Sequence, residues 1–170
     1  MGVSGSGKST VAACLAERLG WTFVDGDSFH SPEHVAKMRA GHPLDDDDRA
    51  PWLAAIGAWI DTRLQRHEPG VVVCSALRRA YRDVLVRRRD AVRIVYLDGD
   101  RDLIERRLAE RRGHFMPATL LDTQFAILEP PAPEEDAVSV RIDAAPEAIA
   151  ATIAARLGLG EGAQEPRTPA

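Results

Sequence analysis

The sequence is poor in cysteine and aromatic side chains, and it has no long apolar run. Cys14 and Cys74 are the two cysteines in 170 residues. Both lie in apolar segments, so we expect buried free thiols in a reducing cytoplasm. No stretch approaches the roughly 20 apolar residues of a membrane-spanning helix, so we expect no membrane partner. An excess of basic residues is also missing, because the net charge is −4, which argues against bulk nucleic-acid binding.

The apolar pattern predicts strands that alternate with helices. Four short runs are typical of buried strands: 21–27, 71–75, 92–99 and 137–143. Apolar residues at helical spacing predict helices before, between and after these strands. The predicted helices are 8–19, 32–40, 48–66, 77–89, 101–112, 118–128 and a closing helix through Leu157. This order predicts an α/β fold with a parallel sheet covered on both faces. We expect one domain over residues 1–157 and a disordered tail over 158–170.

The first ten residues, MGVSGSGKST, contain a complete phosphate-binding loop, G-x-x-x-x-G-K-[ST]. Its glycines allow successive backbone N–H groups to converge on phosphate oxygens, and the following helix adds the positive end of its dipole. Lys8 supplies a charge to the phosphates, and the Ser9 hydroxyl is a ligand for Mg²⁺. The predicted nucleotide-binding residues are Gly2, Ser4, Gly5, Ser6, Gly7, Lys8, Ser9 and Thr10.

The loop does not by itself identify the reaction. The Asn-Lys-x-Asp stretch of G proteins is absent, and the run VVVCS ends in Ser75 instead of the aspartate of a large ATPase. Two carboxylates, Asp25 and Asp27, instead end the segment 21–27. At the carboxyl end of a parallel strand, one can hold magnesium through water while the other accepts a proton from an attacking hydroxyl. A simple Asp-Gly-Asp turn is the structural alternative, and the phosphate loop favours a phosphoryl transferase.

One strand of the expected sheet has no counterpart in the sequence. A phosphate loop of this kind follows a strand, but only Met1 precedes Gly2. We therefore expect Met1 to be an internal methionine at the end of a strand that lies upstream of this sequence. A protein that binds nucleotide without catalysis, because the chain is truncated, is the corresponding alternative.

Six blocks in order resemble the bacterial-type gluconate kinases (gluconokinases), P-loop kinases related to shikimate kinase: GVSGSGKST, DGDSFH, KMRAGHPLDDDDRAPWL, VVVCSALRRAYRDVL, VYLDGD and RRGHF…TQFAILEPP. The resemblance implies a three-layer P-loop kinase fold with a lid over about 111–119. It also implies ATP-dependent phosphorylation of D-gluconate at its 6-hydroxyl, giving 6-phospho-D-gluconate and ADP. Another small P-loop kinase, acting on shikimate for example, is the alternative that PLDDDDRAPWL and CSALRR disfavour.

The resemblance also implies roles for individual residues. Asp27 matches the carboxylate that accepts the hydroxyl proton, and Asp25 joins Ser9 as the residues near Mg²⁺. Arg111 matches the lid arginine that stabilises the transferred phosphoryl group, with Arg107 as its alternate. The implied catalytic residues are Lys8, Asp27 and Arg111, and the implied gluconate-binding residues are Asp27, His30, Arg49, Ser75 and Arg78. The sequence does not determine the oligomeric state, and a homodimer is one possibility.

Two charged runs favour structural interpretations. The aspartates at 45–48 lack the alternating spacing of a calcium loop, so a helix N-cap with local contacts is preferred. For Arg49, a surface ion pair with Asp48 is the alternative to substrate binding. The arginines of the second run are Arg78, Arg79, Arg82, Arg87, Arg88 and Arg89. We expect them on a solvated helix face, with Arg78 near the anionic substrates.

Overall fold

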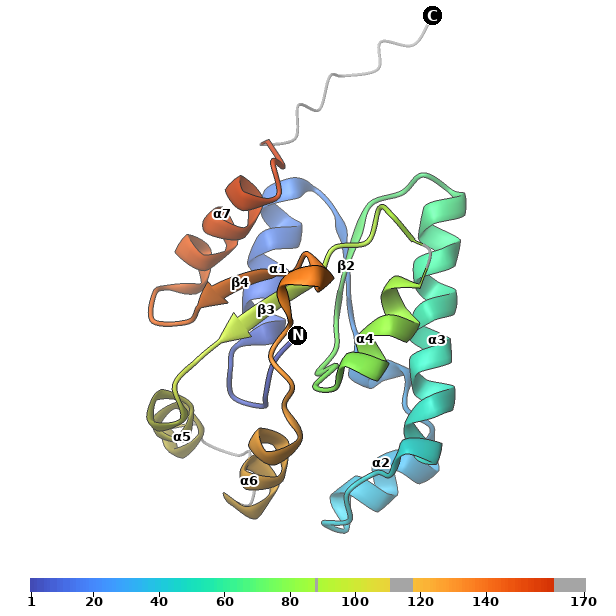
Figure 1. The fold of residues 1–170 in the computed structure, drawn as a ribbon, viewed down its shortest axis with the longest axis vertical. Helices are drawn as coiled ribbons and strands as arrows, with labels where there is room; N and C mark the ends of the chain where they lie inside the picture. Colours follow the sequence, from blue (N-terminus) through green and yellow to red (C-terminus); the bar gives the residue numbers. More distant parts are fainter. Residues whose placement is uncertain (88, 111–117, 161–170) are drawn as a thin grey trace, which may run out of the picture.

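The computed structural model describes residues 1–87, 89–110 and 118–160, in which helices and strands alternate (Figure 1). The helices are α1 (Lys8–Leu19), α2 (Pro32–Arg39), α3 (Asp46–Gln65), α4 (Arg79–Val86), α5 (Arg101–Glu110), α6 (Ala118–Ile127) and α7 (Pro146–Arg156). The strands are β1 (Thr22–Asp25), β2 (Gly70–Val73), β3 (Val95–Asp98) and β4 (Val138–Arg141), and the 3₁₀ turns are η1 (Gly26–Phe29) and η2 (Pro133–Glu135). All four predicted strands are confirmed, each shorter than its apolar run.

The strands form two parallel pairs, β1 with β2 and β3 with β4. The backbone at the start of the chain lies between the pairs. The N–H of Leu97 in β3 donates to the carbonyl of Met1 at 3.0 Å, and the N–H of Gly2 donates to the carbonyl of Ser75, after β2, at 3.1 Å. The phosphate loop therefore begins at the junction of the two strand pairs, as the carboxyl-end rule for ligand sites requires.

Helices cover both faces of the strands and complete three layers (Figure 1). On one face α1 and α7 pack together, α1 against β1 and β2 and α7 against β4. The core on this face includes Val11, Leu15, Leu97, Val140, Ile149 and Ile153. On the other face α3 and α4 bury Trp52, Ile56, Ile60, Tyr81 and Leu85. In the described part of the chain, no helix has both the length and the apolar character needed to cross a membrane.

Local signals place the helix ends. Gly20 ends α1 with a left-handed φ of 66°, the conformation that glycine adopts most readily. Helix α3 begins at Asp46, two residues earlier than the sequence predicts, because Asp45 is its N-cap. The side chains of Asp45 and Asp48 accept hydrogen bonds from each other's backbone N–H at 2.9 and 3.0 Å, which forms a capping box. The N-cap interpretation of the four aspartates is therefore confirmed.

The prediction of a solvated arginine face on α4 is wrong for Arg82, whose side chain is 1% exposed. Its guanidinium pairs with Glu135 through two hydrogen bonds of 2.5 and 2.8 Å. It also donates to the carbonyls of Ala76 at 3.2 Å and Glu129 at 3.0 Å. Because a buried charge must be paired, this arginine joins α4 to the loop after β2 and to the segment after α6.

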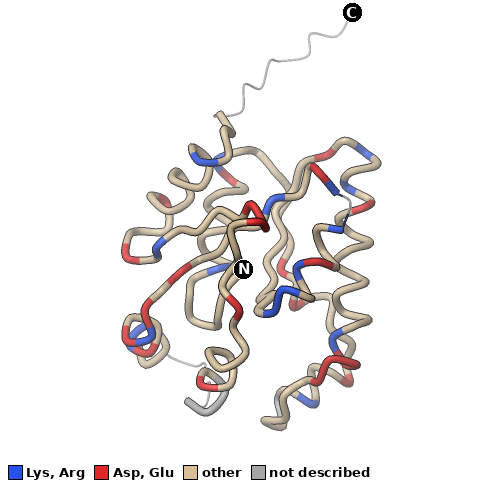
Figure 2. The backbone as a smooth tube through the Cα atoms, viewed as in Figure 1, with Lys and Arg blue, Asp and Glu red and all other residues tan. Residues whose placement is uncertain are grey.

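Three other arginines of this run have acidic partners, and acidic and basic positions are interspersed along α3 and α4 (Figure 2). The pairs are Arg78–Asp46 at 2.8 Å, Arg79–Glu134 at 2.5 Å and Arg89–Asp61 at 2.6 Å. Arg88 lies outside the described residues. The paired arginines support a structural interpretation of the run over a nucleic-acid stripe.

The two cysteines are free thiols, as the sequence predicts. Cys74 is buried directly after β2, and this burial raises the pKa of its thiol to about 12. Cys14 on α1 is only half-buried, so the expectation of burial is wrong for that residue.

Candidate active site

The phosphate loop has the backbone geometry that its sequence predicts. Gly5 and Gly7 adopt φ angles of 82° and 85°, and Gly7 is the N-cap residue of α1. The side-chain ammonium of Lys8 donates to the carbonyl of Val3 at 2.9 Å, across the loop. The loop therefore presents a helix N-terminus and a lysine at one place, which is the arrangement that binds phosphate.

Asp25 at the end of β1 meets the first turn of α1. One carboxylate oxygen of Asp25 accepts a hydrogen bond from the Ser9 hydroxyl at 2.7 Å, and the other accepts the backbone N–H of Asp27 at 3.0 Å. The structure thus brings together the two residues predicted to bind metal. A hydroxyl and a carboxylate in contact supply the hard oxygen ligands that Mg²⁺ prefers, and they leave its other positions to water and phosphates.

Gly26 between the two aspartates packs too tightly for a side chain. A Cβ atom there would lie 2.2 Å from the carbonyl oxygen of Val73 in β2 and 3.2 Å from Cδ1 of Ile56. The buried indole N–H of Trp52 donates to the carbonyl of Gly26 at 2.7 Å. The Asp-Gly-Asp segment is therefore held against β2 and α3 by packing, which a free surface turn would lack.

His30 lies at the far end of η1, over the same tryptophan. Its ring stacks on Trp52 with centroids 4.6 Å apart and an interplanar angle of 8°. The pKa of His30 is lowered by burial, and the nearby Asp27 opposes this shift only partly. The imidazole is therefore neutral at pH 7, and its predicted bond to a substrate hydroxyl stays a prediction.

Arg49 and Arg78 come together although α3 and α4 lie far apart in the sequence. Both donate to the carboxylate of Asp46, Arg49 at 3.4 Å and Arg78 at 2.8 Å, and Arg49 also donates to the hydroxyl of Tyr81 at 3.2 Å. The alternative partner of Arg49, Asp48, instead pairs with Lys37. Sequence reasoning missed Asp46 and Tyr81 at this site, since nothing local indicates which helix face meets α4.

The loop after β2 connects the phosphate loop to the arginine pair. The carbonyl of Ser75 accepts from Gly2, and Ala76 adopts a positive φ of 43°, unusual for a residue with a Cβ. The carbonyl of Leu77 accepts from Glu129 at 2.8 Å, and Arg78 follows directly. The predicted site residues Ser75 and Arg78 therefore stand on one short, tightly bonded segment.

A cavity of about 270 Å³ opens on the other side of the phosphate loop. Gly5, Gly7 and Thr10 line it together with Arg107 and Pro146. The guanidinium of Arg107 donates to the carbonyl of Ile142 at 2.6 Å, which holds this side chain beside the loop. The motifs gave no signal for Pro146, because this residue reaches the loop only through the packing of α7 on α1.

Arg111 and most of the predicted lid, residues 111–117, lie outside the described residues. Helix α6 follows the lid, and the side-chain oxygen of its Gln124 accepts from the N–H of Ser4 at 2.6 Å. Helix α6, which follows the lid segment in the sequence, therefore contacts the phosphate loop.

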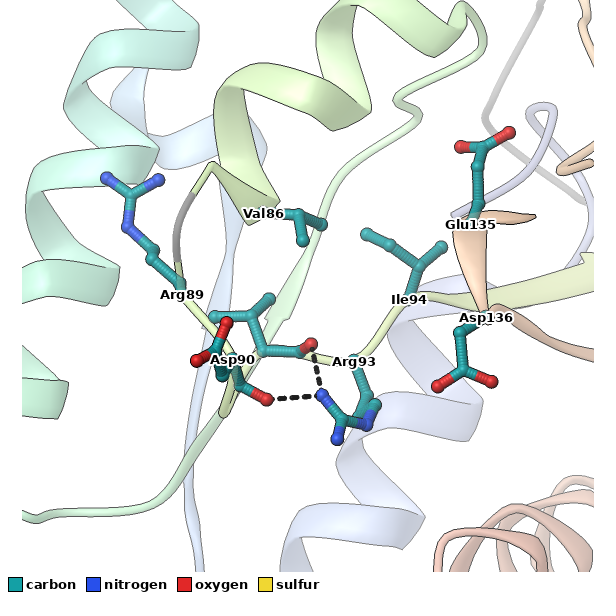
Figure 3. Close-up of a pocket in the computed structure, with 8 residues that line it drawn as sticks. Val86, Arg89, Asp90, Arg93, Ile94, Glu135 and Asp136 are labelled. Carbon is teal, nitrogen blue, oxygen red and sulfur yellow. Dashed lines mark hydrogen bonds between the residues drawn. The ribbon is translucent and has the colours of Figure 1, made fainter.

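A second hollow, of about 300 Å³, lies between the end of α4 and η2 (Figure 3). Arg89 and Glu135 stand on opposite sides of it, and Arg93 lies near its base (Figure 3). Of the charged residues that line the hollow, Arg89 is paired with Asp61 and Glu135 with Arg82. It contains none of the predicted site residues.

Comparisons with known proteins agree with this geometry. A family model described as an AAA domain matches residues 1–131. A probable gluconokinase from Mus musculus is 44% identical over 173 residues, which cover 91% of this chain and 94% of the mouse protein. Two crystal structures are similar: an unliganded sugar kinase from Janibacter (TM-score 0.88, 42% identity, 95% and 93% of the two chains) and a gluconokinase from Sinorhizobium meliloti (TM-score 0.80, 44% identity, 93% of each chain).

The phosphate loop that caps α1, the aspartates after β1 and the parallel α/β architecture define a P-loop kinase. Within that class, the identity over nearly the whole chain decides the family. The chain belongs to the gluconokinase family.

The packing of Gly26 yields a testable prediction. Gly26→Ala forces the added methyl group against the Val73 carbonyl, so η1 must shift and carry Asp25 and Asp27 with it. We expect a lower thermal unfolding temperature and a loss of turnover of at least about tenfold, because small displacements at a reacting site are costly. Gly160→Ala is the matched control, since nothing lies within 4 Å of that position. Equal behaviour of the two variants would contradict the packing argument.

Proposed function

We propose that this chain transfers the γ-phosphoryl group of ATP to the 6-hydroxyl of D-gluconate, giving 6-phospho-D-gluconate and ADP. The observation that carries the proposal is the 2.7 Å contact between the Ser9 hydroxyl and the Asp25 carboxylate, where the phosphate loop meets the end of β1. Membership of the gluconokinase family supports the choice of acceptor.

The phosphate loop and its neighbours are suited to a nucleoside triphosphate with Mg²⁺. Ser9 and Asp25 would hold the metal, which neutralises phosphate charge when it is bound. The loop N–H groups and Lys8 would hold the phosphates, and the cavity beside Arg107 and Pro146 would take the nucleoside. A guanidinium at the cavity wall suits the flat face of a purine.

Asp27 is the group we propose as proton acceptor. It is exposed on the first turn of η1, two residues after the proposed metal ligand Asp25. A carboxylate placed there accepts the proton of the substrate hydroxyl while the phosphate loop fixes the phosphoryl group. Arg49 and Arg78 would bind the gluconate carboxylate, and His30 and Ser75 its hydroxyls.

Charge on the transferred phosphoryl group needs a further donor. We assign this role to Arg111, as the sequence implies, with Arg107 as the alternate. The hydrogen bond from Arg107 to the carbonyl of Ile142 holds this side chain beside the phosphate loop, which supports Arg107 as the alternate.

Turnover with different acceptors tests the proposed function. We expect ADP release from ATP and Mg²⁺ with D-gluconate in a coupled assay, and only background release with shikimate or with no acceptor. Turnover with shikimate in place of gluconate would favour the related kinase activity. Nucleotide binding without ADP release from any acceptor would favour the inactive-binder alternative.

Two variants separate the roles of the paired aspartates. Asp27→Asn removes the proton acceptor, so kcat falls by about 10²–10⁴ while the Kd for ATP is retained. Asp25→Asn removes a metal ligand, so the Mg²⁺ concentration for half-maximal rate rises. Titrating both variants with Mg²⁺ under saturating ATP and gluconate distinguishes them. If excess Mg²⁺ rescues Asp27→Asn and leaves Asp25→Asn unchanged, the two assignments are reversed.

A further inference from the structure

We propose that Asp46 and Tyr81 are positioning residues that hold Arg49 and Arg78 together as a two-arginine clamp for the carboxylate of the sugar-acid substrate. This inference rests on the proposed function and extends it to residues outside the site that the sequence predicts. We call Arg49 and Arg78 together the arginine clamp.

One carboxylate and one phenol fix both guanidinium groups. Different oxygens of Asp46 accept the hydrogen bonds from Arg49, at 3.4 Å, and Arg78, at 2.8 Å. The Tyr81 hydroxyl donates to the same oxygen of Asp46 that Arg49 contacts, and it accepts from Arg49 at 3.2 Å. The guanidinium carbons lie 5.6 and 5.9 Å from the centre of the Tyr81 ring, within cation–π range.

The clamp keeps most of its donors for another anion. A guanidinium group carries five N–H donors, and within the described residues Arg49 and Arg78 each donate through Nη1 alone. Their side chains are 21% and 38% exposed, so part of each arginine is open to solvent. With two arginines and one aspartate the cluster has a net charge of +1, the complement of one substrate carboxylate.

The electrostatics keep the positioning pair in the required protonation states. The hydrogen bond from Tyr81 and the two nearby arginines hold the pKa of Asp46 below its usual range, so it remains a carboxylate. Burial and the Asp46 carboxylate raise the pKa of Tyr81, so its hydroxyl remains a donor. Across the neutral range the cluster therefore keeps one charge state.

Asp46 acts through the arginines and not on the substrate carboxylate itself. Two carboxylates in contact repel, so Asp46 gains nothing from touching the substrate carboxylate directly. Arginine side chains are long and lose considerable rotamer freedom when they are ordered. Because Asp46 and Tyr81 order both arginines before the substrate binds, substrate binding does not carry this entropy cost. The affinity of the protein for the substrate is therefore higher.

Steady-state kinetics of Asp46→Asn and Tyr81→Phe test the proposal. Each substitution preserves shape while weakening the hold on the arginine clamp. We expect the KM for gluconate to rise about tenfold, the effect of roughly 1.4 kcal/mol, with kcat and the KM for ATP nearly unchanged. Asp47→Asn is the matched control, because its side chain is exposed at the next position of α3. It should match the wild type.

A double-mutant cycle separates positioning from direct binding. In an Arg49→Ala/Arg78→Ala background, Asp46→Asn should change kcat/KM for gluconate less than about twofold, because the residues it acts through are gone. A full, additive loss in that background would show that Asp46 contacts the substrate itself and would overturn the proposal.

Comparison of the KM values for gluconate separates the positioning role from the proposed function. Equal KM values for Asp46→Asn and Asp47→Asn would overturn the positioning role while leaving the proposed function intact. A wild-type protein that does not phosphorylate gluconate would instead refute the proposed function. If thermal unfolding shows that Asp46→Asn does not fold, Tyr81→Phe alone decides, since it keeps the ring in the core and removes only the hydroxyl.

Discussion

The close approach of Gly26 to the carbonyl of Val73 is the constraint on which the rest of the site depends. No side chain fits at this position, so the backbone of η1 lies directly on β2 and is tied to α3 by the Trp52 indole. That contact fixes Asp25 against Ser9 on one side and His30 on Trp52 on the other. The proposed metal ligand Asp25, the proposed proton acceptor Asp27 and the proposed substrate-binding ring of His30 thus share a single rigid support.

The site joins two halves of the molecule that have separate cores. The phosphate loop belongs to the layer of α1 and α7, whereas the arginine clamp belongs to the layer of α3 and α4. The loop after β2 connects them, since Ser75 bonds to Gly2 and Arg78 completes the clamp. We propose that phosphates bind one layer and the sugar acid the other, so that transfer occurs where the layers meet.

Local sequence was sufficient for the features that a short segment determines by itself. The phosphate loop, the strand segments and the N-cap before α3 follow from spacing and turn chemistry, and the contact of Ser9 with Asp25 follows from the carboxyl-end rule. The prediction that Arg82 is solvated is wrong because periodicity does not show which arginine will be buried in a pair with a glutamate distant in the sequence. Asp46 and Tyr81 were missed for the same reason: their roles arise only when α3 packs on α4. Arg111 lies outside the described residues, so its role stays a prediction.

We propose that the sugar acid lies between the two layers, with its carboxylate on the arginine clamp and its 6-hydroxyl toward the phosphate loop. A crystal structure of the wild-type protein with a non-hydrolysable ATP analogue, Mg²⁺ and D-gluconate tests it most directly. We expect the gluconate carboxylate on Arg49 and Arg78, and the 6-hydroxyl within hydrogen-bond distance of the Asp27 carboxylate, facing the γ-phosphate. A gluconate bound the other way round, with its carboxylate toward the phosphate loop and its 6-hydroxyl on the arginines, would contradict it.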